Sequence, residues 1–90
     1  MLQVEYSRDA VRTLLRIDRA TARRIRAKVD QLATDPAALA NNVTALKGGD
    51  GLMRLRVGDW RVIYTADLVV LLVVLLVVRV APRGSAYEGV

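Results

Sequence analysis

Two short runs that meet at a tight turn constrain the fold of this chain most. Residues 52–57 and 61–64 combine Leu, Val and Ile with arginine, and Gly58-Asp59 lies between them. A Gly-Asp pair between two apolar runs is typical of a β-hairpin, because glycine adopts the backbone conformation that a two-residue turn requires. The second half of the chain therefore contains an antiparallel strand pair, against which the rest of the fold must pack.

Three arginines lie within this hairpin. Arg54 and Arg56 are two residues apart, so their side chains leave the strand on the same face, and the turn brings Arg61 back alongside them. Guanidinium groups are planar and permanently charged, so several of them on one surface indicate a site for an anion such as phosphate. As alternatives, Arg54 and Arg56 are solvated side chains, and Arg61 is a cation–π partner of Trp60, which itself is expected in the core.

The amino-acid composition limits which partners and which catalytic groups this chain can have. The formal charge is +5, and twelve of the fourteen basic residues are arginine; charge alone leaves nucleic acid, an anionic membrane and an acidic protein as partners. The chain has no Cys and no His, which excludes disulfides, thiolate zinc sites, Ser-His-Asp triads and two-histidine ribonucleases. We therefore expect no metal and no cofactor, and any catalysis must use Arg, Lys, Tyr, Asp or Glu. Absence of Cys also fits a reducing cytoplasm.

Periodicity predicts the remaining elements within one domain over residues 1–90. Strands are expected at Leu2–Tyr6, Leu52–Val57, Arg61–Thr65 and Leu68–Val80, with a short one at Thr44–Leu46, and helices at Arg8–Ile17 and Thr21–Ala33. Residues 37–44 read as a connector, and a turn is expected around Ala66-Asp67. The predicted class is α+β in the order β-α-α-β-β-β, with a helical hairpin on one face of a small, mostly antiparallel sheet.

The apolar run Leu68–Val78 raises the question of whether the chain spans a membrane. It has eleven residues, whereas a helix that spans a bilayer needs about 20. Because the run does not alternate, it predicts a central strand covered on both faces. The polar, charged N-terminus does not resemble a signal peptide, so we expect a cytoplasmic protein without a membrane segment.

Four segments in this order resemble the RelE/ParE toxin superfamily, the toxin half of bacterial toxin–antitoxin pairs. They are Tyr6-Ser7 before the basic helical hairpin, Leu46-Lys47-Gly48, the hairpin of residues 52–64, and residues 79–87. The resemblance covers nearly the whole chain and implies the RelE-like fold. One branch, RelE, cleaves mRNA in the ribosomal A site without a metal, and the other, ParE, poisons DNA gyrase.

The resemblance also implies roles for individual residues. Arg61 matches the arginine that contacts the reacting phosphate, Arg83 the arginine that assists the leaving group, and Tyr87 the tyrosine that orients the scissile nucleotide. Arg56 joins this catalytic set, and Lys47, Arg54 and Arg79 are expected to hold RNA. Arg54 and Arg56 stand where relatives carry two lysines. Since arginine cannot act as a base, the base is left open between Lys47 and Glu88.

The leading hypothesis is a toxin that cleaves ribosome-bound mRNA. Its expected partners are the ribosome, mRNA and an acidic antitoxin that folds on binding and supplies any contact with operator DNA. The alternatives are a ParE-like gyrase inhibitor without ribonuclease activity and a degenerate toxin that still binds its antitoxin.

Overall fold

The computed structural model describes residues 3–46, 51–69 and 72–82, with side chains for all of these except 67–69 and 72–76. The elements follow one another as β1 Gln3–Tyr6, α1 Arg8–Arg16, α2 Arg19–Thr34, the 3-10 helix η1 Pro36–Asn42, β2 Val43–Ala45, β3 Met53–Val57, β4 Trp60–Val69 and β5 Leu72–Pro82. The predicted order β-α-α-β-β-β thus gains one short strand, β2, close to where a short strand was expected.

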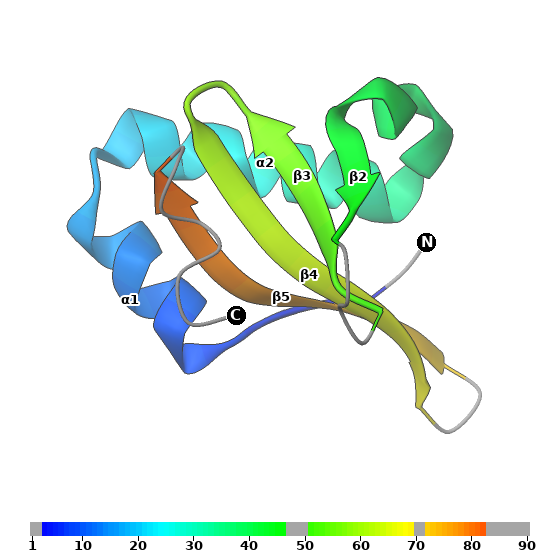
Figure 1. The fold of residues 1–90 in the computed structure, drawn as a ribbon. Coiled ribbons are helices and arrows are strands. Elements are labelled where there is room, and N and C mark those ends of the chain that lie inside the picture. Colours follow the sequence, from blue (N-terminus) through cyan, green and yellow to red (C-terminus); the bar gives the residue numbers. More distant parts are fainter. Residues whose placement is uncertain (1–2, 47–50, 70–71, 83–90) are drawn as a thin grey trace.

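The strands form one sheet in the order β1-β5-β4-β3-β2. β1 runs parallel to β5, and the other neighbouring pairs are antiparallel. Both α-helices lie on the same side of the sheet (Figure 1), so within the described ranges the opposite side carries no α-helix. The predicted α+β class, with a helical hairpin on one face of a mostly antiparallel sheet, is confirmed.

Two polar residues start the helices. The Ser7 side chain accepts a hydrogen bond from the Ala10 amide and caps α1, while its hydroxyl donates to the Val78 carbonyl. Ser7 therefore ties the start of α1 to β5. Asp18 caps α2 by accepting from the Thr21 amide at 3.0 Å, which lets α2 begin earlier than the expected Thr21.

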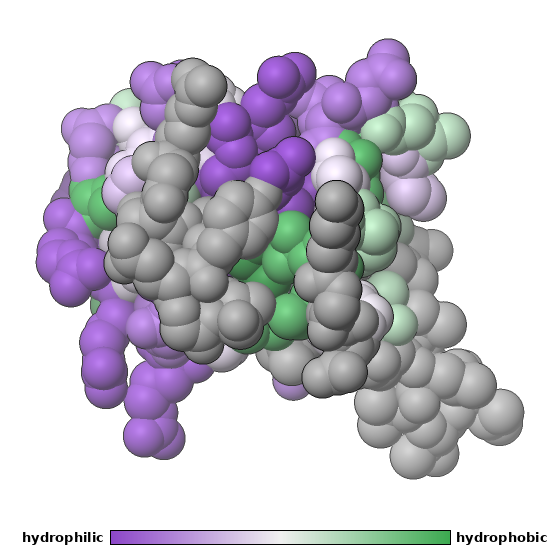
Figure 2. Space-filling view, in the orientation of Figure 1, coloured by the Kyte–Doolittle hydropathy of each residue, from purple (hydrophilic) through white to green (hydrophobic). Residues whose placement is uncertain are grey.

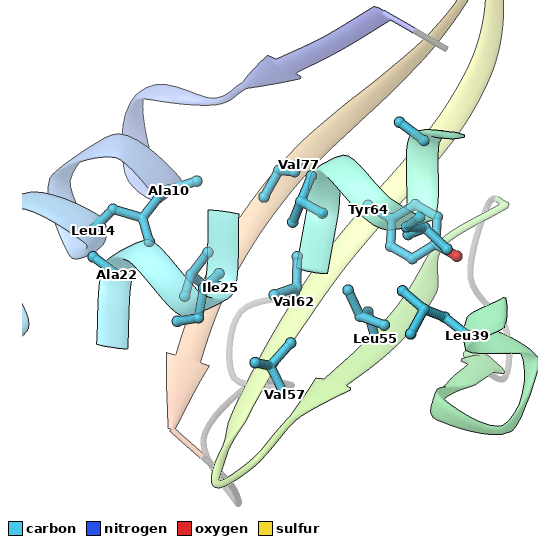
Figure 3. Packing of buried hydrophobic residues seen from close by; sticks show 14 residues of the cluster. Ala10, Leu14, Ala22, Ile25, Leu39, Leu55, Val57, Val62, Tyr64 and Val77 are labelled. Atoms are coloured by element: carbon cyan, nitrogen blue, oxygen red, sulfur yellow. The ribbon is translucent and has the colours of Figure 1, made fainter. Parts of the chain in front are cut away.

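The main core lies between the helices and the sheet (Figure 3). The apolar residues at helical spacing on α2 are all buried, and they are Ala22, Ile25, Val29 and Leu32. Leu55, Val62 and Val77 meet them from three neighbouring strands. Apolar residues at helical spacing on α2 and at alternate positions on the strands therefore form one core, as their periodicities indicate.

The turn predicted around Ala66-Asp67 is wrong. β4 continues through both residues to Val69, and β5 begins at Leu72. The apolar run therefore pairs with itself, and this gain outweighs the turn preference of a single aspartate. The single strand expected at Leu68–Val80 is therefore divided between β4 and β5. β5 has a strand on either side, β1 and β4, as expected for a central strand, while the predicted cover of both faces concerns side chains that lie largely outside the described ones.

The connector predicted for residues 37–44 is partly helical. Pro36 occupies the first turn of η1, where its fixed φ and missing amide proton are tolerated. Among the helices of the described residues, none is long and apolar enough to cross a membrane.

Candidate functional site

Four arginines define one surface, which we call the arginine face: Arg54 and Arg56 on β3, Arg61 on β4 and Arg79 on β5. Arg56 lies directly opposite Arg61, and Ile63 lies between Arg54 and Arg79 in one row across the three strands. Directly opposite residues have Cβ atoms about 5 Å apart. The predicted juxtaposition of Arg54, Arg56 and Arg61 is therefore what the strand register produces.

Alternation along the strands fixes the direction of these side chains. Leu55, Val57 and Val62 are buried in the main core on the helix side. Because successive strand residues point to opposite faces, Arg56 and Arg61 lie on the side of the sheet that the helices do not cover. Arg56 is exposed and Arg61 is half-buried.

A β-bulge places Arg79 on the same face. Ile63 pairs with Arg79 but Tyr64 pairs with Val77, so one residue of β5 has no partner in β4. If the register of the Tyr64–Val77 pair continued without a shift, Arg79 would lie opposite Val62, whose side chain belongs to the main core. The bulge thus keeps a guanidinium out of the core and adds it to the arginine face.

An apolar floor lies beneath the arginines. Ile63 is fully buried and Ala81 is 4% exposed, and Leu46 and Leu52 pack against them in a second, smaller cluster. Figure 2 shows hydrophilic residues next to a hydrophobic patch on this side of the molecule. Apolar surroundings lower the local dielectric, so a charge bound here interacts with the arginines more strongly than it would in water.

The β3–β4 turn holds Arg61. Its Nη1 donates to the Gly58 carbonyl at 2.9 Å and to the Trp60 carbonyl at 3.0 Å. Gly58 has φ of +58°, a conformation that favours glycine. Trp60 packs against the main core, as expected. The backbone of the turn therefore positions the guanidinium of Arg61.

Arg24 of α2 lies close to the β3–β4 turn that holds Arg61, and sequence reasoning missed this approach. Its Nη2 lies 3.4 Å from where a Cβ on Gly58 would stand, so α2 brings a further guanidinium to the β3–β4 turn. The sequence indicates only that Arg24 is on the outer face of α2. Its approach to the turn depends on how the helix lies against the sheet, for which no local pattern is a signal.

The other predicted residues fall into two groups. Lys47, Arg83, Tyr87 and Glu88 lie outside the described residues. Tyr6 and Tyr64, which the structure does describe, are on the helix side with the main core. Burial raises the pKa of Tyr64, and burial together with Asp30 raises the pKa of Tyr6, which Arg26 partly offsets. Neither phenol is placed to exchange a proton at the arginine face. Within the described ranges, no three acidic side chains cluster in a way that could hold a metal.

Solved structures identify the class of protein with this fold. A chain of the archaeal RelE–RelB complex from Pyrococcus horikoshii OT3 matches with a TM-score of 0.74 at 30% identity, over 94% of this chain and 98% of that one. The isolated RelE toxin of E. coli matches with a TM-score of 0.71 at 14% identity, over 92% and 85%. A chain of the Methanococcus jannaschii RelB–RelE complex gives 0.65 at 18%, over 100% and 99%. The last two show likeness of fold alone.

The family follows from sequence comparison. The family described as the ParE toxin of the type II toxin–antitoxin system parDE matches residues 4–87, whereas no curated protein matches the chain in sequence. The chain belongs to the RelE/ParE superfamily and is a toxin of the type II toxin–antitoxin class. The resemblance seen in the sequence is confirmed.

Proposed function

We propose that this toxin is a metal-independent endoribonuclease that cleaves mRNA on the ribosome and so inhibits translation. The observation that carries the proposal is Arg56 directly opposite Arg61. Like charges at directly opposite positions repel each other, and guanidinium groups this close together suit a phosphate bound between them. A phosphodiester bound between them relieves the repulsion, and a phosphorane, which carries more negative charge, relieves it further.

Arg61 is the group that we assign to the phosphorane. Two carbonyl groups already hold its Nη1, so little conformational entropy is lost when the substrate binds. Arg56 supplies a second charge, and Arg54 and Arg79 hold the neighbouring phosphates. By resemblance, Arg83 assists the leaving 5′-oxygen.

The nucleotide and the 2′-hydroxyl need further groups. By resemblance, Tyr87 orients the scissile nucleotide and Lys47 adds to the grip on RNA. The 2′-hydroxyl must lose a proton, and arginine, with a pKa above about 12, cannot accept it. Lys47 and Glu88 stay the candidates for this step. A site that depends mainly on charge stabilisation and alignment is expected to react more slowly.

A ParE-like inhibitor of DNA gyrase is the second candidate. Two points favour it: the matching family is that of ParE, and by resemblance Arg54 and Arg56 stand in the place of a lysine pair. In this alternative the arginine face binds without cleaving.

An acidic antitoxin is the proposed protein partner. Structures of similar chains are complexes of RelE with RelB. On this chain Leu15 is 75% exposed, and it lines a hollow of about 350 Å³ between α1 and α2 together with Arg19, Arg23 and Arg26. An acidic segment that folds into an amphipathic helix complements an apolar surface rimmed by arginines. Contact with operator DNA would come through this antitoxin.

Primer extension on translating ribosomes tests the proposal. We expect the wild type to cut mRNA and Arg61→Ala to lose about 3 kcal/mol of transition-state stabilisation, or roughly a hundredfold in rate. Arg12→Ala, which removes an exposed arginine of α1, is the matched control and should cut normally. Inhibition of gyrase supercoiling without mRNA cleavage would instead establish the second candidate.

A further inference from the structure

A cleft of about 470 Å³ lies between α1 and the end of β5. It exists because β1 pairs with β5 only as far as Val77, after which the chain turns at Ser7 into α1. The last residues of β5 therefore face a helix and not a strand across this edge. The volume falls in the range of sites for small ligands, about 300–1,000 Å³.

The side chains of the cleft combine three chemistries. Arg16 and Arg79 bring positive charge, Asp9 brings negative charge, and Thr13 adds a hydroxyl group from α1. Trp60 is half-buried and lines the cleft on the sheet side. A simple anion would be repelled by Asp9, and an apolar ligand would make no use of the charged side chains in the lining. A nucleotide uses the whole set.

Each part of a nucleotide has a counterpart here. Indole and guanidinium planes stack on bases, and guanidinium groups bind phosphate. A carboxylate accepts hydrogen bonds from an exocyclic amino group such as N4 of cytosine. Asp9 therefore favours a base that carries an amino group over one that carries a carbonyl at the same position.

The cleft is continuous with the arginine face through Arg79, which belongs to both. We propose that it is a nucleotide subsite, in which an unstacked base of single-stranded RNA lies while the neighbouring phosphate is held on the arginine face. This inference rests on the proposed ribonuclease function and adds a specificity site to it. RNA would cross the edge of β5 to reach the cleft.

Trp60 makes the test direct, because it is the only tryptophan of the chain. The full chain is titrated with short 2′-O-methyl oligocytidine, which lacks the reactive 2′-hydroxyl and cannot be cleaved, while Trp60 fluorescence and the anisotropy of labelled RNA are recorded. We expect quenching that saturates with binding. Oligouridine, with a carbonyl in place of the amino group, should bind about tenfold more weakly.

Two variants assign the signal to the cleft. Arg16→Ala removes a cleft arginine that is not on the arginine face, and we expect about tenfold weaker binding. Asp9→Asn should abolish the preference for cytidine. Arg12→Ala, on the same helix but outside the cleft, should bind as the wild type does, and thermal melts verify that each variant is folded.

Three results would overturn the subsite. One is saturation of anisotropy without change in Trp60 fluorescence, and another is equal affinity of Arg16→Ala and wild type. The third is that Arg16→Ala binds RNA normally but no longer binds an acidic antitoxin, which would make the cleft a protein-docking surface. The ribosome assay tests the proposed function separately. Cleavage of mRNA without a change in Trp60 fluorescence would contradict the subsite and leave the proposed function standing. A change in Trp60 fluorescence without cleavage on the ribosome would leave the subsite standing and contradict the ribosomal target.

Discussion

The two faces of this sheet differ in what they bring together: one buries apolar side chains, and the other gathers arginines. The helix-side face meets α1 and α2 in one core, to which the described part of the chain contributes fourteen buried residues. The arginine face has a small cluster around Ile63 and Ala81, and Arg56 and Arg61 stand opposite each other across the strands. Most of the burial that stabilises the described part of the chain is therefore on the helix-side face.

The difference shows how a short chain can hold several charges close together. Alternation along β3 and β4 means that each arginine on one face is flanked by residues such as Leu55 and Val62 on the other. Burial of those neighbours, about 2 kcal/mol or more for each side chain, offsets the repulsion between guanidinium groups. The core therefore fixes the geometry that the arginine face needs.

The largest effect is expected in the main core. Leu55 and Ile63 are both fully buried, one in each cluster. Leu55→Ala should lower the free energy of unfolding by about 4 kcal/mol, because the tightly packed surroundings cannot fill the cavity. Ile63→Ala should lower it by about 2 kcal/mol, since a small cluster collapses more easily. Urea denaturation followed by circular dichroism measures both.

Leu15→Ala is the control for these substitutions. Leu15 is 75% exposed, so its truncation should change stability by less than about 0.5 kcal/mol. Equal losses in Leu55→Ala and Ile63→Ala would mean that both faces contribute alike to stability, and the contrast between them would be lost.

Much of the stable face could be predicted from sequence. The stripe of α2, the cap at Ser7 and the turn at Gly58-Asp59 are local patterns, and each is found in the structure. The juxtaposition of Arg54, Arg56 and Arg61 was also predictable, because a hairpin with a two-residue turn has one register.

What could not be predicted depends on contacts distant in sequence. The end of β4 at Val69 reflects pairing between two halves of one apolar run, and Asp67 gave the opposite local signal. The place of Arg79 depends on a bulge, and that of Arg24 on how α2 lies against the sheet. The cleft beside Trp60 exists because β1 ends before β5 does. None of these has a signature within a short window of sequence.

A smaller effect is expected where α1 joins the sheet. Ser7→Ala removes a helix cap and the hydrogen bond to the Val78 carbonyl, so it should cost about 2 kcal/mol of stability. Asp18→Ala removes an exposed cap whose carboxylate accepts hydrogen bonds from Thr21 of the same helix, and should cost about 1 kcal/mol. Thermal or urea unfolding of both variants compares them. A loss at Ser7 no greater than at Asp18 would show that the link to β5 adds nothing.

On the arginine face, a substitution is expected to raise the free energy of unfolding and not to lower it. Arg56→Thr removes one of two opposed charges and places a residue with good strand propensity on β3. We expect stability to rise by about 0.5 kcal/mol while cleavage of ribosomal mRNA falls. Urea unfolding and primer extension on the same preparation measure the two quantities. A loss of stability would mean that Arg56 supports the fold and that the two faces do not differ in kind.

The smallest expected effect is a dependence of stability on pH, which comes from the helix side of the sheet. Tyr6 and Tyr64 lie on the helix side, and burial raises the pKa of each above its ordinary value of 10.0. The folded protein therefore holds these protons more tightly than the unfolded chain does. Their contribution is fully present below about pH 10 and is lost as the pH rises through the folded-state pKa. We expect stability to fall above pH 10, and to fall less steeply in Tyr6→Phe and Tyr64→Phe, which cannot ionise. Urea midpoints at pH 8, 10 and 11 test this, and an unchanged slope in both variants would show that the phenols are hydrated and that the core does not exclude water there.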